Sequence, residues 1–115
     1  MIDIKNYNKN NIFAKILRND VPSTKIYENK YIYAFKDISP KAAVHVLIIP
    51  KSEYCSFHDF SEKASPKEQA IFYKSIREIA LMLKISKGYR LITNVGAGGG
   101  QEVPHFHFHL LSEKK

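Results

Sequence analysis

Cysteine is nearly absent from the chain, and no apolar stretch in it is long enough to span a membrane. Cys55 is the only cysteine, which excludes an internal disulfide framework and fits a reducing compartment. Residues 1–11 lack the apolar stretch of a secretory signal, and apolar runs such as Val46–Ile49 are far too short to cross a bilayer. We therefore expect a cytoplasmic protein that has no membrane partner.

The chain also lacks a basic arm, although its net charge is +7. Lysines are scattered from Lys5 onward, and the longest contiguous basic run is the pair Lys114–Lys115. A dispersed positive charge is typical of a solvated surface, whereas nucleic-acid binding proteins cluster their charge on one face. We expect no nucleic-acid partner, but the charge favours small molecules that carry phosphate.

The length allows one compact domain and leaves little room for a second core. The 115 residues are 44% apolar, which is enough for a core without disulfides or a structural metal. Residues 1–10 are polar and rich in asparagine, so we expect a loosely ordered end followed by a single domain over residues 11–115. No internal repeat or low-complexity linker interrupts this order.

The residue patterns predict an α+β fold with a mainly antiparallel five-stranded sheet, one short helix and one long helix. Asn11 is a suitable N-cap for the short helix, and Ser65, Pro66 and Glu68 form the capping-box signal of the long one, which we expect Gly88 to end. The predicted strands cover residues 24–29, 31–37, 43–50, 89–95 and 103–111. The first two should form a hairpin, and the last two should pair across a glycine-rich loop.

Three histidines alternate with apolar residues near the end of the chain, in the order His105, Phe106, His107, Phe108, His109 and Leu110. Successive side chains of a strand point to opposite faces, so this pattern places the three imidazoles on one face and the apolar side chains in the core. The histidine row should then border solvent or a pocket. Pro104 removes one backbone donor, which suggests that the start of this strand is not paired on one side.

Three interpretations of the histidine row compete. A histidine on a half-exposed strand is often only a tolerated polar residue. A His-x-His pair can bind zinc, but the outer Cα atoms of the row would be roughly 13 Å apart in a strand, and the sequence nominates no further ligand. Alternatively, the central imidazole acts as a nucleophile at phosphorus and its neighbours bind oxygens or the departing group. The glycines of residues 96–100 suit this third interpretation, because backbone amides without side chains can form a nest for an anion.

The motif from His105 to Leu111 resembles the signature of the histidine triad (HIT) family, in which His-x-His-x-His precedes two apolar residues. Three further stretches, IFAKILRNDVPSTKIYE, AFKDISPKAAVHVLIIPK and KGYRLITNVGAGGGQEVPHFHFHLL, are similar to the Hint branch, the nucleoside phosphoramidate hydrolases. The similarity extends over about residues 11–112 in the correct order. It implies the HIT fold and a homodimer whose two sheets join into a larger one.

The resemblance implies a catalytic role for four histidines. His107 corresponds to the nucleophile, which forms a covalent nucleotidyl-histidine that water then hydrolyses. His105 and His109 correspond to the residues that flank the phosphate, and His45 to a supporting histidine. The chain itself indicates that His45 is buried, because it alternates with Leu47 and Ile49 on a predicted strand.

The same comparison implies a nucleotide-binding set. Asp37 matches the aspartate that binds ribose, and the base pocket corresponds to Ile12, Phe13, Ile16, Phe35 and Ile38. Asn94, Gly100 and Gln101 match the phosphate region. Glu102 departs from the family, since Hint proteins commonly carry serine there, and an acid would repel phosphate unless it points away or pairs with a basic leaving group.

The expected function is hydrolysis of purine nucleoside 5'-phosphoramidates of the AMP-amine type, with no cofactor and no metal. A dinucleoside polyphosphate hydrolase or a nucleotidyl transferase is the alternative within the same superfamily. A nucleotide-binding regulatory protein without catalysis is the alternative from another class. The expected partner is a purine nucleotide substrate with either an AMP or a GMP moiety.

Overall fold

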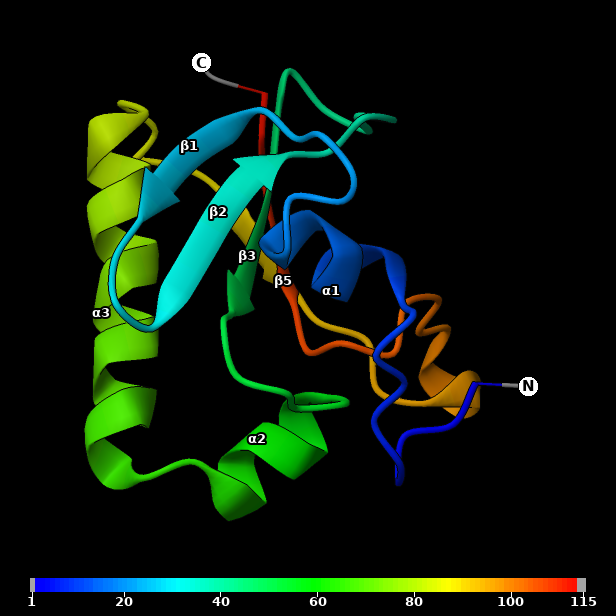
Figure 1. Ribbon diagram of the computed structural model, residues 1–115. Coiled ribbons are helices and arrows are strands. Elements are labelled where there is room, and N and C mark those ends of the chain that lie inside the picture. Colours follow the sequence, from blue (N-terminus) through cyan, green and yellow to red (C-terminus); the bar gives the residue numbers. More distant parts are fainter. Residues whose placement is uncertain (1, 114–115) are drawn as a thin grey trace.

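A computed structural model describes residues 2–113 of the protein and confirms the α+β architecture (Figure 1). Its elements in chain order are α1 (Ile12–Leu17), β1 (Lys25–Glu28), β2 (Ile32–Lys36), β3 (Val44–Pro50), α2 (Phe57–Lys63), α3 (Pro66–Met82), β4 (Arg90–Ile92), the short 3-10 turn η1 (Ala97–Gly99) and β5 (Phe108–Ser112). None of the helices in this part of the chain has the length and apolarity that crossing a bilayer requires.

The five strands form one antiparallel sheet in the order β1-β2-β3-β5-β4. The expected hairpin joins β1 to β2, and β4 pairs with β5 across the glycine loop, as predicted. β3 lies at the centre and is buried from His45 onward. Its position follows from its sequence, because a strand covered on both faces needs an almost continuous apolar run.

The two faces of the sheet carry different layers. α3 lies along one face and α1 against the other (Figure 1). Alternation along β3 sends Val46 and Ile48 into the α3 layer, and it sends Leu47 and Ile49 toward α1. His45 shares the α1 face with these last two residues, so the chemistry-bearing side chains face away from the main core.

The α3 layer is built on stacked aromatic rings. Phe106, two residues before β5, lies 4.7 Å from Phe60 and 5.1 Å from Phe72, measured between ring centroids. All three side chains are fully buried. This packing fixes the chain just ahead of β5 and thereby orients the histidines on either side of Phe106.

The helix boundaries match the predictions at their N-terminal ends and differ at one C-terminal end. Asn11 Oδ1 accepts from the Ala14 amide at 2.9 Å, and Ser65 Oγ accepts from the Glu68 amide at 3.0 Å. Glu68 does not complete the capping box, because its carboxylate accepts from the Tyr54 hydroxyl instead. The left-handed residue that follows α3 is Lys84, with φ of 61°, and the prediction for Gly88 was wrong.

Helix α2 was not predicted from the sequence. Ser56 caps it by accepting from the Asp59 amide, and the Asp59 carboxylate accepts from the Cys55 amide at 2.8 Å. These reciprocal bonds resemble a capping box, with aspartate in place of the usual glutamate. Ser56 and Asp59 therefore form a local helix-start signal, which was overlooked because the surrounding segment is polar.

Candidate active site

A pocket of about 560 Å³ opens on the α1 face of the sheet and is lined by most of the predicted site residues. All of the predicted catalytic and nucleotide-binding residues line it except His105 and Gln101. Those that line it are Ile12, Phe13, Ile16, Phe35, Asp37, Ile38, His45, Asn94, Gly100, Glu102, His107 and His109. One wall is apolar and comes from α1 and β2, whereas the floor near β3 and β5 carries the histidines.

The histidine row is not a continuous strand. β5 begins only at Phe108, so His109 belongs to the strand while His105 and His107 precede it. The start of the row makes a tight turn in which the His105 amide donates to the Val103 carbonyl at 2.9 Å. The prediction that all three imidazoles border solvent or a pocket is therefore wrong for His105, whose side chain is fully buried.

Both ring nitrogens of His105 are engaged by neighbouring groups. Nε2 lies 2.8 Å from the Pro50 carbonyl oxygen, and Nδ1 lies 2.5 Å from the Tyr7 hydroxyl. A carbonyl only accepts, so Nε2 carries the proton of the neutral ring, and Nδ1 accepts from the tyrosine. His105 thus presents no free ring nitrogen to a ligand.

The ring of His107 is oriented by the backbone of the same turn. Its Nδ1 lies 2.6 Å from the His105 carbonyl oxygen and must donate there. Nε2 is then the unprotonated nitrogen, and no described residue bonds to it. Phe13 packs edge-on against the ring at a centroid distance of 5.0 Å, which holds the imidazole at the pocket wall.

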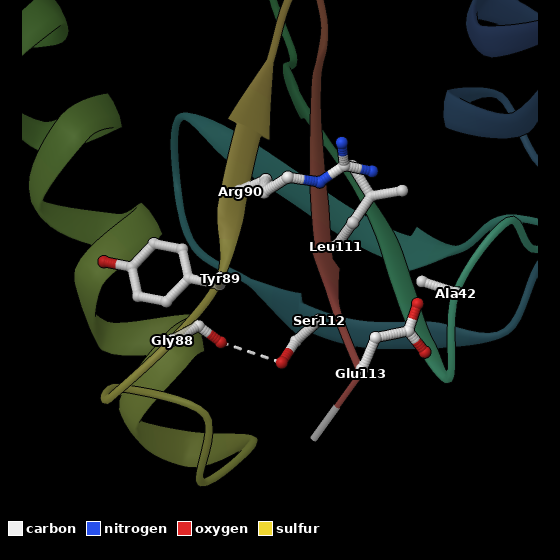
Figure 2. A pocket seen from close by; sticks show the side chains of 7 residues that line it. All are labelled: Ala42, Gly88, Tyr89, Arg90, Leu111, Ser112 and Glu113. Atoms are coloured by element: carbon white, nitrogen blue, oxygen red, sulfur yellow. Dashed lines mark hydrogen bonds between the residues drawn. The ribbon is translucent and has the colours of Figure 1, made fainter. Parts of the chain in front are cut away.

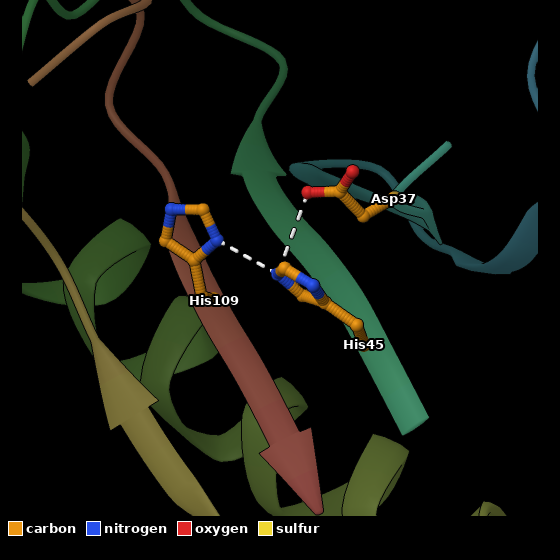
Figure 3. A group of neighbouring side chains, drawn as sticks. All are labelled: Asp37, His45 and His109. Atoms are coloured by element: carbon orange, nitrogen blue, oxygen red, sulfur yellow. Dashed lines mark hydrogen bonds and ion pairs between the residues drawn. The ribbon is translucent and has the colours of Figure 1, made fainter. Parts of the chain in front are cut away.

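Asp37, His45 and His109 form a cluster whose side chains point toward one another (Figure 3). The Lys41 amide donates to His45 Nδ1 at 3.0 Å, which leaves the His45 proton on Nε2. That Nε2–H lies 2.9 Å from His109 Nδ1 and 3.4 Å from Asp37 Oδ2. His109 Nδ1 is therefore an acceptor, and its Nε2 carries a proton.

This group has the composition of a metal site, but the bonds of His45 point to a different use. A histidine that binds a metal usually donates its second ring nitrogen to a carbonyl or carboxylate. The second nitrogen of His45 accepts from a backbone amide instead, so its Nε2 is a donor and offers no lone pair. The residues present therefore fit a hydrogen-bonded relay better than a metal centre.

Burial keeps the histidines neutral. Removal from water lowers the pKa of His105 and of His107 to about 4, since the protein interior disfavours the charged ring. Burial also lowers the pKa of His109 and of His45, although the charge of Asp37 opposes the shift in both. At neutral pH the free nitrogen of His107 therefore holds a lone pair.

The glycine loop differs from the expected anion nest. The amides of Gly99, Gly100 and Gln101 donate back to carbonyls of the loop itself, which closes η1. Gly96 and Gly100 have φ of 66° and 77°, so the tight reversal uses the left-handed conformations that glycine adopts without strain. The buried Gln101 side chain bonds to the backbone of Gly96, Cys55 and Val103, and its place is structural.

Two cationic side chains at the pocket, Lys41 and Arg90, were not predicted from the sequence. Arg90 also lines a smaller hollow of about 210 Å³ where β4 begins and β5 ends, and there Ser112 Oγ donates to the Gly88 carbonyl at 2.8 Å (Figure 2). Basic residues are scattered along the chain, so only the folded structure distinguishes these two. Tyr7 was missed for a similar reason, because it is 98 residues away from its partner His105.

Comparison with known proteins assigns the family. A family model described as HIT domain matches residues 18–115. A HIT-like protein of Rickettsia prowazekii is 51% identical over 110 residues, which are 95% of this chain and 92% of that protein. The protein therefore belongs to the HIT family, and the fold and the histidine motif described above are those of that family.

Solved structures agree with this assignment. A HIT family hydrolase from Legionella pneumophila is 39% identical with a TM-score of 0.84, covering 92% of this chain and 95% of that one. A histidine triad nucleotide-binding protein from Sulfolobus tokodaii is 27% identical with a TM-score of 0.76, covering 86% of this chain and 66% of that one.

Proposed function

We propose that this protein hydrolyses nucleoside 5'-phosphoramidates, in the manner of the Hint branch, through a nucleotidyl-histidine intermediate on His107. The observation that carries the proposal is the free Nε2 of His107 at the wall of a nucleotide-sized pocket. Its bond to the His105 carbonyl fixes the tautomer, and burial keeps the ring neutral, so the nucleophile needs no prior deprotonation.

The pocket offers a separate place for each part of a nucleotide. The apolar wall around Phe13 and Phe35 suits a purine base. Asp37 lies at the edge of that wall, where its Oδ1 accepts from the Ser39 amide at 2.8 Å. Its carboxylate has further lone pairs with which to accept from both ribose hydroxyls. A nucleotide held at these two places would extend its phosphate toward the histidines.

The proposed reaction proceeds in two displacements at phosphorus. His107 Nε2 attacks, the N–P bond to the enzyme forms, and the bond from phosphorus to the substrate amine breaks. The amine takes a proton from His109 Nε2 as it leaves, and the water of the second displacement returns that proton to His109. Water then attacks the phosphorus and restores His107, and two inversions give net retention. Lys41 and Arg90 add positive potential at the pocket where negative charge develops.

A homodimer is part of the proposal. β4 is an edge strand of the sheet, and Leu91 on it is 42% exposed. An exposed edge with an apolar side chain is a ready site for pairing with a second copy. The protein should therefore elute as a dimer in size-exclusion chromatography with light scattering, and Leu91→Lys should shift it toward the monomer.

The test of the function is a turnover comparison of an AMP-amine amidate, a diadenosine polyphosphate and a nucleotide sugar on the same protein. The proposal expects the amidate to give the highest kcat/KM. A preference for the diadenosine compound or for the sugar would instead assign the protein to the dinucleoside polyphosphate hydrolases or to the nucleotidyl transferases. Nucleotide binding without turnover of any of the three would favour a regulatory protein.

A further inference from the structure

The N-terminal segment of residues 2–10 contains no helix or strand, yet it reaches the first histidine of the motif. The Tyr7 hydroxyl lies 2.5 Å from His105 Nδ1, and the two rings meet edge to face at a centroid distance of 5.5 Å. His105 is fully buried, whereas Tyr7 is only half-buried. A residue outside the sheet therefore supplies a bond that the interior of the protein requires.

The direction of this bond follows from the neighbouring groups. The Pro50 carbonyl takes the proton of His105 Nε2, so Nδ1 is an acceptor and the tyrosine hydroxyl must donate. Burial raises the pKa of Tyr7, and the phenol therefore keeps its proton at neutral pH. His105 is held on one side by the last residue of β3 and on the other by the N-terminal segment.

The bond is connected to the nucleophile through the backbone of His105. The same residue whose ring is held by Tyr7 provides the carbonyl that accepts from His107 Nδ1 at 2.6 Å. The two ring bonds of His105 anchor the Val103–His105 turn that carries this carbonyl, and a turn that shifts once an anchor is lost would weaken the bond that keeps His107 Nε2 unprotonated. Without the tyrosine hydroxyl, Nδ1 of a fully buried ring would lose its donor, which is an unfavourable state that such a change would relieve.

We infer that Tyr7 is a positioning residue, which fixes the His105 ring and through it the tautomer and orientation of His107. The expected effect on the rate of nucleotidyl-histidine formation rests on the proposed function. The expected effect on the ring tautomers does not. It makes the N-terminal segment a part of the active site, although Tyr7 does not line the pocket.

The test compares Tyr7→Phe with Tyr27→Phe. The first removes the hydroxyl and keeps the ring. The second removes an equivalent hydroxyl that donates to Glu78 at 2.9 Å on the surface. We expect Tyr7→Phe to slow formation of the nucleotidyl-histidine by about tenfold, which is the worth of one buried hydrogen bond, with KM nearly unchanged. Tyr27→Phe should keep the wild-type rate.

Nitrogen-15 NMR of the histidine rings gives a second readout that needs no substrate. In the wild type, His105 should be protonated at Nε2 and His107 at Nδ1, and Tyr7→Phe should introduce the other tautomer or an average of the two at one or both rings. Wild-type ring shifts and a wild-type rate in Tyr7→Phe would overturn the inference. If the wild-type protein forms no nucleotidyl-histidine at all, the proposed function fails while the NMR comparison still decides the role of Tyr7.

Discussion

Acid should destabilise this protein through its buried histidines, and His107 gives the clearest measure of the effect. Its pKa is about 4 in the folded protein, against an ordinary value of 6.5. Between these two values the unfolded chain binds a proton that the folded protein does not bind. Stability therefore rises with pH in this range, is fully present above pH 6.5, and is lost as the pH falls toward 4.

The size of the effect follows from the two pKa values. Lowering the pH from 7 to 5 should cost about 2 kcal/mol of unfolding free energy for His107 alone. His105 has the same pKa of about 4 and should add a similar amount. Both side chains are almost completely buried, so solvent screening reduces these figures little.

Urea unfolding at pH 7 and at pH 5, at one protein concentration, measures the effect in the wild type and in His107→Asn. The asparagine amide can still donate to the His105 carbonyl but does not titrate. The variant should therefore lose about 2 kcal/mol less than the wild type between the two pH values. His58→Ala, which replaces an exposed histidine of α2, is the control for loss of a histidine outside the pocket. Equal losses in the wild type and in His107→Asn would refute the reasoning.

Three further substitutions test the ribose site, the aromatic core and the glycine loop. Asp37→Asn should raise KM for a ribonucleotide substrate by about tenfold and leave a 2',3'-dideoxy analogue much less affected, since the carboxylate is proposed to bind the ribose hydroxyls; equal effects in steady-state kinetics would remove Asp37 from that role. Phe106→Ala should lower the unfolding free energy measured in urea by about 3–5 kcal/mol, because a fully buried ring stacked on Phe60 is lost. A loss below about 1 kcal/mol would contradict this packing. Gly100→Ala should lower the unfolding free energy by about 1–2 kcal/mol. The loss comes from the φ of 77° alone, because no heavy atom lies within 4 Å of the added carbon. An unchanged thermal midpoint would contradict the left-handed conformation.

Local patterns in the sequence were enough to predict the sheet and the burial of His45. The alternation of His45 with Leu47 and Ile49 indicated a buried position, and the structure places it on the face that α1 covers. The N-cap residues Asn11 and Ser65 marked the starts of both predicted helices. These features depend on neighbours a few positions apart, which is the range over which sequence patterns act.

The burial of the His105 ring depends on contacts between residues far apart in the sequence. Alternation assumes a strand, and the strand begins only at Phe108 because the chain turns at Val103–His105. Pro104 had signalled an interruption there, but it did not indicate that the His105 ring would be sequestered between Pro50 and Tyr7. No local pattern connects Tyr7 with the histidine motif, since folding alone brings them together.

The proposed function depends on a bond between the free Nε2 of His107 and phosphorus. Rapid-quench intact-mass spectrometry with an AMP-amine amidate detects this bond, and His107→Asn is the control. We expect a transient mass gain of one nucleoside monophosphate that maps to His107 in the wild type and is absent from the variant. Full turnover by His107→Asn, or an adduct that maps to another residue, would contradict it.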